Sequence, residues 1–331
     1  MLKFKKTLKA SELNENWNKI SKYFFQNKEF LYHAEKYNPC KQRYYQCFKN
    51  DEFVGGAVMY SIRLDLLTFL RIKSPLKMNI VGIPASVSAP GIIGEPQIIN
   101  QIKNHIIKEE KGLVVFLNLE QEPDFKDIAT GNTLPTIVLK NNFASWEDYR
   151  SKLRANYRRR LNLLEKTSNI ELIELNCNEF TEQMHEQYLQ VYNKSKDKLE
   201  KLSFNFFKKL PDEFQLTICK KENQLLGWNI TTKHKNYFYF FLGGIDYKHN
   251  AENQTYLRLL ANIVKQGIEQ KFEYIDLGQT AEIPKLRMGG LLEPKYMQAK
   301  HSNKIFNKII KTAEKSLGYN RKIKEMHVFN S

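Results

Sequence analysis

The sequence predicts an α/β protein in which two copies of one mixed-sheet domain follow each other along the chain. Residues 47–55, CFKNDEFVG, and residues 219–227, CKKENQLLG, share a Cys, a Lys and an apolar pair before a Gly at a constant offset of 172. The same order of predicted elements surrounds both motifs. The chain has 331 residues and 42% hydrophobic content, which suits about two domains of roughly 150 residues, each with its own core.

Each copy opens with a helical stretch, and the repeated motif follows as strand, polar turn and strand. Another strand, a helix and a short strand then complete the copy. The helical stretches are expected at 11–36 and 179–210, the turns at 49–52 and 221–224, the later helices at 96–111 and 252–270, and the short strands at 112–119 and 272–277. A meander followed by a strand–helix–strand connection predicts a mixed sheet with a right-handed crossover.

The second copy shows this order most clearly, with strands expected at 215–220, 225–232 and 237–245. The third strand, YFYFFLGGI, is apolar on both faces, which is typical of a central strand. The next helix carries apolar residues at helical spacing from Leu257 to Ile268. We expect a ligand where the strands' C-terminal ends meet the N-terminus of that helix.

Positive charge gathers in two stretches of this basic protein, whose formal net charge is +16. Residues 150–166 hold seven basic residues and one acid, residues 295–325 hold nine and two, and both stretches are predicted to be helical. In the first, Leu153, Tyr157, Leu161 and Leu164 form one apolar stripe, and the arginines lie off it. The arginines form either a solvated face or a surface that binds phosphates.

Several classes of protein are excluded by what the sequence lacks. The cysteines (Cys40, Cys47, Cys177 and Cys219) form no CxxC pair and are expected to be reduced structural thiols, so no metal site is expected. No P-loop, dinucleotide or serine-hydrolase signature occurs. No apolar run reaches the roughly 20 residues that a membrane-spanning helix needs. The N-terminus has no secretory signal pattern, so we expect a cytoplasmic protein.

Three stretches carry a resemblance to a known family: 149–160, YRSKLRANYRRR; 243–250, GGIDYKHN; and 276–290, which opens with DLGQT and ends with KLRMGG. With the meander and crossover, they resemble the GNAT acyltransferase fold. The doubling is similar to the FemABX and FemAB-like acyltransferases. This resemblance implies an α/β (α+β) fold of two tandem GNAT-like domains packed side by side. It implies an acceptor-side domain at 1–143, a catalytic donor-side domain at 144–316, and a tail at 317–331 packed back on the first domain.

The resemblance also implies a catalytic group. Lys285 matches the family's lysine ahead of a glycine pair, and its ammonium would stabilise an oxyanion, unless it is a surface lysine in a loop. Asp276 would orient the acceptor amine, or it would cap Gly278 and the following loop. Tyr296 would give a proton to the leaving group, or it is a half-buried strand residue.

The substrate-binding residues follow from the same resemblance. The donor would lie against the loop before the crossover helix, at Tyr247, Lys248, His249, Asn250, Asn253, Gln254 and Thr255. That loop lacks the glycines with which GNAT enzymes bind the pyrophosphate of coenzyme A. The acceptor would lie near Ser88 and Gly91, in the loop 86–94 that precedes a helix at Pro96, and Arg154 and Arg158 would bind a phosphate-bearing substrate.

The expected function is transfer of an acyl or aminoacyl group to an amine on a small molecule or cell-envelope precursor. The co-substrate is either an acyl-CoA or an aminoacyl-tRNA, with no metal. No long helical arm is present, so a dedicated tRNA arm is not expected, although tRNA remains a candidate partner. No obligate protein partner is evident. Peripheral contact with an anionic membrane, at its inner face, is also open. The alternative is a non-catalytic protein whose basic helices bind nucleic acid or an anionic surface.

Overall fold

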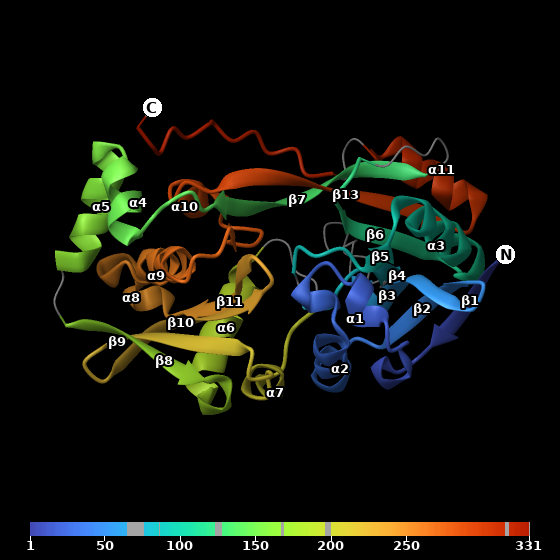
Figure 1. Ribbon diagram of the computed structural model, residues 1–331, viewed down its shortest axis with the longest axis horizontal. Coiled ribbons are helices and arrows are strands. Elements are labelled where there is room, and N and C mark those ends of the chain that lie inside the picture. The colour runs from blue at the N-terminus through green and yellow to red at the C-terminus, as the bar shows by residue number, and fades with distance from the viewer. Residues whose placement is uncertain are drawn as a thin grey trace. The chain divides into compact units, whose positions relative to one another are not determined.

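The computed structural model describes residues 1–64, 76–85, 87–122, 128–166, 169–195, 200–314 and 318–330 (Figure 1). It has the mixed α/β architecture that the sequence predicts. The chain divides into two compact units, and each combines segments distant in sequence. Unit 1 comprises Met1–Pro135, Leu199–Ser203 and Pro294–Arg321, and unit 2 comprises Thr136–Lys198, Phe204–Glu293 and Lys322–Ser331.

Unit 1 contains one mixed sheet with the strand order β1-β2-β3-β4-β6-β13. Its strands are β1 (Leu2–Thr7), β2 (Gln42–Lys49), β3 (Glu52–Leu64), β4 (Leu76–Val81), β6 (Leu113–Leu119) and the part of β13 (Leu291–His301) from Pro294. The crossover through α3 (Pro96–Glu109) makes β4 and β6 parallel, as expected. The other pairs are antiparallel, and the short β5 (Ile92–Gly94) adds to β3.

The N-terminal helical stretch of unit 1 is broken into short pieces. They are the 3-10 helices η1 (Ala10–Glu12) and η2 (Phe24–Gln26) and the α-helices α1 (Trp17–Ile20) and α2 (Lys28–Tyr37). The buried Trp17 explains one break, because its indole nitrogen donates to the Gln26 carbonyl and holds the chain between these pieces. The core packs α3 against the sheet around Ile102, Ile106 and Phe116.

Unit 2 repeats this plan with the strand order β7-β12-β11-β10-β9-β8. Its strands are β7 (Ala129–Lys140, from Thr136), β8 (Ile170–Asn176), β9 (Phe214–Lys221), β10 (Gln224–His234), β11 (Tyr237–Ile245) and β12 (Tyr274–Asp276). The β9–β10–β11 meander matches the predicted strands within a few residues. The parallel pairing of β11 with β12 confirms the predicted crossover.

The helices of unit 2 cover both faces of its sheet. They are α4 (Trp146–Lys152), α5 (Ala155–Lys166), α6 (Glu182–Lys194), α7 (Phe204–Lys208), α8 (Tyr247–Asn253), α9 (Thr255–Glu269) and α10 (Glu282–Leu286), with the 3-10 helix η4 (Cys177–Glu179). Trp228 on β10 donates to the Met184 carbonyl of α6, and the adjacent Gly227 lies against Thr255 of α9. Because neighbouring strand residues point to opposite faces, α6 and α9 lie on opposite sides of the sheet (Figure 1).

Two sequence-based helix predictions are wrong in detail. Residues 150–166 form the end of α4 and all of α5, because Leu153 is buried in extended conformation and bridges to Phe329. Residues 295–325 contain the end of β13 and the helix α11 (Lys304–Thr312), followed by an extended segment in the described part. The expected tail at 317–331 also differs from the prediction, because Val328 and Phe329 pack in the core of unit 2.

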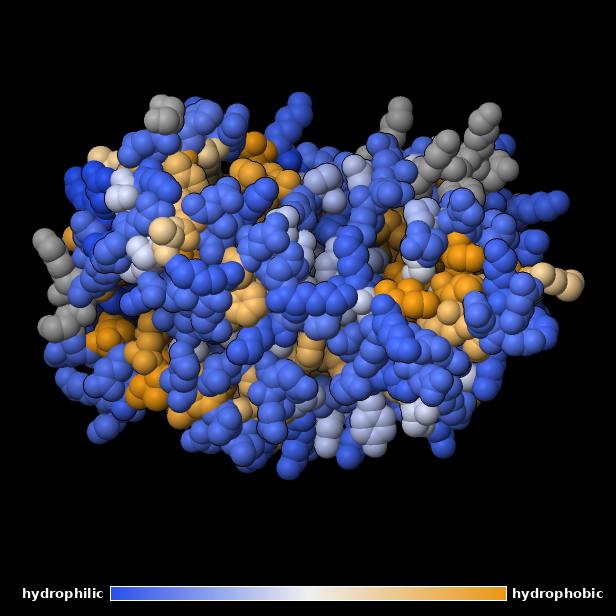
Figure 2. All heavy atoms as spheres, in the orientation of Figure 1, coloured by the Kyte–Doolittle hydropathy of each residue, from blue (hydrophilic) through white to orange (hydrophobic). Residues whose placement is uncertain are grey.

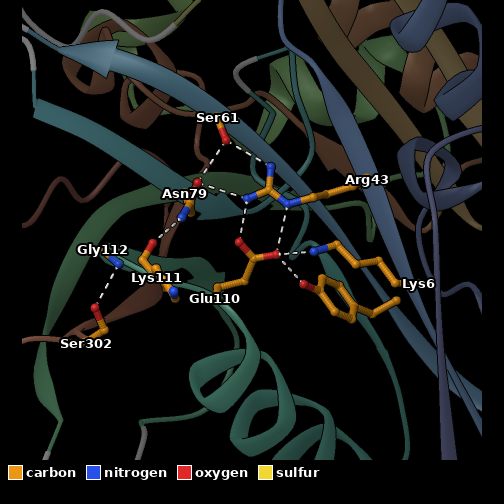
Figure 3. A network of polar contacts seen from close by, with 9 residues as sticks. Lys6, Arg43, Ser61, Asn79, Glu110, Lys111, Gly112 and Ser302 are labelled. Carbon is orange, nitrogen blue, oxygen red and sulfur yellow. Dashed lines mark hydrogen bonds and ion pairs between the residues drawn. The ribbon is translucent and has the colours of Figure 1, made fainter.

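A polar network fixes the far end of the unit 1 crossover. The Glu110 carboxylate, just after α3, accepts hydrogen bonds from Arg43 at 3.1 and 3.0 Å, from Lys6 at 2.7 Å and from the Tyr45 hydroxyl (Figure 3). Burial opposes ionisation of this carboxyl, but these donors outweigh it and lower the pKa of Glu110 to about 2. The network therefore ties β1 and β2 to the end of α3.

Candidate functional site

The candidate site lies in unit 2, where β11 and β12 separate. The two strands pair from Tyr237 with Tyr274 to Tyr239 with Asp276. At that point β12 ends, and β11 continues to Ile245. Beyond the last pair, the backbone groups on this side of β11 therefore form no hydrogen bonds with β12. The loop after β12 approaches β11 there, with Gly278 beside the Phe240 carbonyl.

Lys285 is the most unusual side chain in this region. It lies on α10 and is only 2% exposed, so the surface-loop alternative is wrong. Its Nζ donates to the Gln279 carbonyl at 2.5 Å and lies 5.6 Å from the centre of the Phe240 ring. Burial lowers the pKa of Lys285 to about 7, while the carboxylates of Asp276 and Glu282 act in the opposite direction. Lys285 can therefore exchange a proton near neutral pH.

Asp276 holds the loop that carries Lys285. Its Oδ1 accepts from the Gly278 amide at 2.7 Å and from the Thr136 hydroxyl at 3.0 Å. The carboxylate is 5% exposed, so it is positioned by β12 and β7 together. This geometry is the capping role that the sequence left as one of two alternatives, and it places a negative charge close enough to act on Lys285.

The loop between β12 and α10 has a strained backbone. Gly278, Thr280 and Ala281 have φ values of 72°, 58° and 46°. Two of these three residues have side chains, and left-handed conformations are unfavourable for them. The conformation turns the chain sharply enough to bring the first turn of α10 back beside Asp276. Strain of this kind often occurs where a side chain must be aimed at a reaction centre.

The predicted donor loop is mostly helical. Tyr247, Lys248, His249, Asn250 and Asn253 belong to α8, Gln254 is a left-handed residue between the helices, and Thr255 opens α9. Lys194 lies 3.6 Å from the centre of the Tyr247 ring, and burial raises the pKa of Tyr247. These residues therefore surround the N-terminus of the crossover helix, where a ligand was expected.

Asn250 uses the backbone amides at that helix end. Its side-chain Oδ1 accepts from the Tyr256 amide at 3.0 Å, and its backbone carbonyl accepts from the Gln254 amide. Arg258 adds a 2.8 Å bond from Nε to the Asn253 carbonyl. A phosphate at this helix end has to compete with Asn250 for the Tyr256 amide, whereas helix N-termini that bind phosphate leave such amides free.

The two predicted phosphate-binding arginines contact backbone carbonyls. Arg158 donates from Nη1 to the carbonyls of Ser151 at 3.2 Å and Leu153 at 3.3 Å. Arg154 donates from Nε to the Phe329 carbonyl at 3.1 Å, and its amide donates to the Val328 carbonyl. Both arginines therefore hold the corner between α4 and α5, and among the described residues these bonds use only some of the five N–H donors of each guanidinium.

Three predicted site residues, Tyr296, Ser88 and Gly91, belong to unit 1, whereas Lys285 belongs to unit 2. Tyr296 on β13 is partly buried against the α3 core and pairs with Leu119. Ser88 is partly exposed, and its neighbour Ser86 lies outside the described residues. Gly91 has a structural reason to be glycine, because a Cβ there would lie 2.2 Å from the Gly82 amide nitrogen. Its carbonyl also accepts from the Val58 amide.

Two residues of the site were missed in the sequence. Glu282 is 5% exposed on α10, and its charge acts on Lys285. Thr136, from a strand 140 residues earlier in the chain, donates to Asp276. The spacing of Glu282 and Lys285 on one helical turn was a usable signal, whereas nothing local marks Thr136. Within the described part of the chain, no cluster of His, Cys, Asp and Glu is arranged to hold a metal ion.

One family model matches part of unit 2. Residues 151–285 match the model described as an acetyltransferase (GNAT) domain, and this segment runs from α4 to Lys285 itself. No curated protein matches the sequence. None of the described helices has the length and apolar character needed to cross a bilayer.

Solved structures show the same fold at low sequence identity. A conserved protein of unknown function from Bacteroides thetaiotaomicron is 9% identical, with a TM-score of 0.52 over 90% of this chain and 99% of that one. The C-terminal domain of a putative lysylphosphatidylglycerol synthetase from Agrobacterium fabrum is 8% identical, with a TM-score of 0.51 over 79% and 85%. L-PGS from Bacillus licheniformis is 9% identical, with a TM-score of 0.50 over 88% and 94%.

Proposed function

We propose that this chain is an acyltransferase that moves an acyl or aminoacyl group from a thioester or ester donor to an amine acceptor, and the match of residues 151–285 to a GNAT acetyltransferase domain supports this. The observation that carries this proposal is the buried Lys285, held at the point where β11 and β12 separate. Transfer to an amine needs a bound carbonyl, an amine that loses its proton, and stabilisation of the tetrahedral oxyanion.

Lys285 supplies the electrophilic group in this proposal. The acceptor nitrogen attacks the donor carbonyl carbon, and the carbonyl electrons move to oxygen as the new C–N bond forms. The Lys285 ammonium, kept partly charged by Asp276 and Glu282, stabilises that oxyanion. The attacking nitrogen loses one proton to solvent, the C–O or C–S bond to the leaving group breaks, the leaving group takes up one proton, and the amide is released. Tyr296 remains our candidate for that proton, and Ser88 and Gly91 remain candidates for the acceptor side.

The donor we favour is an aminoacyl-tRNA, with acyl-CoA as the alternative. The support is Asn250, whose side chain occupies the Tyr256 amide where coenzyme A pyrophosphate would be expected. The donor-side residues Tyr247, Lys248, His249, Asn253, Gln254 and Thr255 then contact the acyl end of the donor. Arg154 and Arg158 would contact phosphates only through the donors that the carbonyls leave free.

The acceptor we propose is an amine on a cell-envelope precursor. One structural neighbour is the C-terminal domain of a putative lysylphosphatidylglycerol synthetase. The name of that neighbour refers to a membrane lipid that carries an amino acid. A cytoplasmic protein at the inner face of the membrane fits such an acceptor.

The decisive experiment is a donor screen on the full chain by thermal shift, followed by transfer assays. Aminoacyl-tRNA is expected to raise Tm more than uncharged tRNA does, and acetyl-CoA and longer acyl-CoAs are expected to leave it unchanged. A saturable rise with acyl-CoA would assign the thioester donor instead. Binding of tRNA that is independent of charging, falls steeply with salt and gives no transfer would favour the non-catalytic alternative.

Asn250 provides a variant for the same screen. Asn250→Ala removes the acceptor for the Tyr256 amide, and we expect a loss of about 1 kcal/mol in the free energy of unfolding. Asn250→Asp keeps that acceptor and serves as the matched control. If coenzyme A binds through the freed amide, Asn250→Ala will show a CoA-dependent rise in Tm that the Asp variant lacks. We expect no such rise in either variant.

A further inference from the structure

Helix α11 of unit 1 presents an apolar stripe to solvent. Ile305, Phe306 and Ile309 are 72%, 55% and 57% exposed, and no residue of α11 is buried. Large apolar side chains exposed singly are common, but three on adjoining turns of one helix form a contiguous patch. The stripe is built on nine residues, a length of about 13 Å.

A cationic edge flanks the apolar stripe. At 100° per residue, Lys304, Lys308 and Lys311 project roughly 105–170° from the centre of the stripe formed by Ile305, Phe306 and Ile309. Lys304 and Lys308 are exposed, and neither forms an ion pair in the part of the chain that the structure describes. Ser302, just before α11, and Gly112 are joined by two hydrogen bonds of 2.9 and 3.0 Å (Figure 3). Lys111 precedes Gly112, so these bonds bring a further positive charge near the start of α11.

Unit 1 holds α11 firmly in this orientation. The N-terminal end of the helix is attached by the two hydrogen bonds between Ser302 and Gly112 and by the Asn307 side chain, which accepts from the His301 amide of β13 at 3.1 Å. After the helix, Glu314 accepts from the Thr130 amide at 3.2 Å. Both ends are therefore attached, so the apolar stripe cannot turn inward without breaking these bonds.

We propose that α11 docks on an anionic lipid bilayer, with Ile305, Phe306 and Ile309 inserted at the headgroup boundary and the lysines beside the phosphates. A helix with lysines on one face and bulky apolar residues on the other is the form that lies in a membrane interface. A second copy is a poor occupant, because apposed stripes would bring both sets of lysines together. Nucleic acid would engage the lysines and leave the apolar stripe in water. The proposal does not depend on the reaction or on its donor.

The test is co-sedimentation of the full chain with vesicles of phosphatidylglycerol and phosphatidylcholine in equal parts, and with phosphatidylcholine alone. We expect binding to the anionic vesicles that weakens with salt. Phe306→Ser with Ile309→Ser should lower the partition coefficient ten-fold or more, an order-of-magnitude expectation for apolar insertion. The matched control is Leu163→Ser on the basic helix α5, where Leu163 is 50% exposed, and it should bind as the parent does.

The electrostatic half of the proposal has its own pair of variants. Lys304→Gln with Lys308→Gln should lower the partition coefficient about five-fold for each lysine removed. Lys19→Gln with Lys36→Gln, at exposed positions elsewhere in unit 1, should leave it unchanged. Failure of the parent to bind, or loss of binding that is equal in α11 and control variants, would overturn the proposal. So would a dimer in analytical ultracentrifugation that the Phe306/Ile309 variant abolishes, since that would assign the stripe to a second copy.

Discussion

The proposed chemistry rests on a single buried amine, Lys285. The sequence placed this residue in a loop after the last short strand, whereas it lies on the helix α10 and is buried. Burial makes the charged form expensive, and two nearby carboxylates offset part of that cost. The result is an amine whose charge changes near neutral pH, which an exposed lysine would not do.

Lys285→Met is expected to lower the transfer rate roughly 100-fold or more, the size of effect seen when one oxyanion donor is lost. The fold should be kept, because Met fills the volume without an uncompensated charge. In the proposed mechanism the charged form of Lys285 acts, so the parent rate should fall as pH rises through about 7. Lys285→Arg stays charged, so its pH profile should lack that fall whatever its absolute rate. A parent profile that rises through the same range would assign Lys285 as a base instead.

Other residues of the site show why side-chain roles were harder to predict than positions. Asp276 lay at a strand end, and either capping or substrate contact suited that place. Its bonds to the Gly278 amide and the Thr136 hydroxyl depend on how the loop turns and on a strand from another part of the chain. Asn250 was expected in a loop without glycine. Its bond to the Tyr256 amide depends on its position in the helix α8, which the local sequence did not predict.

At the scale of elements, the corner between α4 and α5 turns a basic stretch into a structural joint. The apolar stripe through Leu153 and Leu161 was predicted and is buried. The break was not, because it depends on the pairing of Leu153 with Phe329, 176 residues later. Arg158 and Arg154 then donate hydrogen bonds to backbone carbonyls at this corner.

Arg154→Gln with Arg158→Gln is therefore expected to lower the free energy of unfolding by roughly 1–2 kcal/mol, the worth of the carbonyl bonds that are lost. Arg159→Gln with Arg160→Gln removes the same charge from exposed positions of α5 and should change the free energy of unfolding little. Urea unfolding of both variants decides the matter. Equal stability in the two, with a raised KM only in the first, would show that Arg154 and Arg158 bind substrate.

The Glu110 network gives a second prediction about elements. Glu110→Gln should cost about 2 kcal/mol, because Arg43 and Lys6 lose a charged acceptor in a mostly buried place. The pKa of Glu110 is lower in the fold than in the unfolded chain, so its contribution is complete above about pH 4.5 and is lost as pH falls toward 2. The difference in free energy of unfolding between the parent and Glu110→Gln should therefore narrow as pH falls from about 4.5 toward 2. Asp51→Asn, at the exposed Lys3–Asp51 pair, should show little effect and no such narrowing.

At the scale of the whole molecule, the repeat and the meander predicted two units of one fold, because strand and helix patterns are local. The same local signals missed how the sheets are completed. β13 supplies the strand beside β6, and β7 supplies the strand beside β12. Each of these pairings joins residues more than a hundred positions apart, and no periodicity records them. Hydrophilic residues cover most of the face seen in Figure 2, in keeping with the charged composition.

Division of the chain between residues 143 and 144 is expected to give two fragments that do not fold alone. The first fragment lacks Pro294–Arg321 and leaves β6 as an unpaired apolar edge, and the second lacks Thr136–Lys140 beside β12. Such edges promote aggregation. Solubility and circular dichroism of each fragment test this, with the full chain as control. Cooperative unfolding of either fragment by itself would contradict it.

The exchange of final strands also has a consequence during synthesis. The ribosome releases β6 long before it makes the residues that pair with it, because Leu119 pairs with Tyr296. At about 5–20 residues per second, that interval lasts about 10–40 seconds. During this time Leu113, Val114 and their neighbours have no partner on one side. We therefore expect the nascent chain to depend on chaperones during this interval, and conditions that slow translation should reduce the yield of this protein more than that of a chain whose domains finish in order.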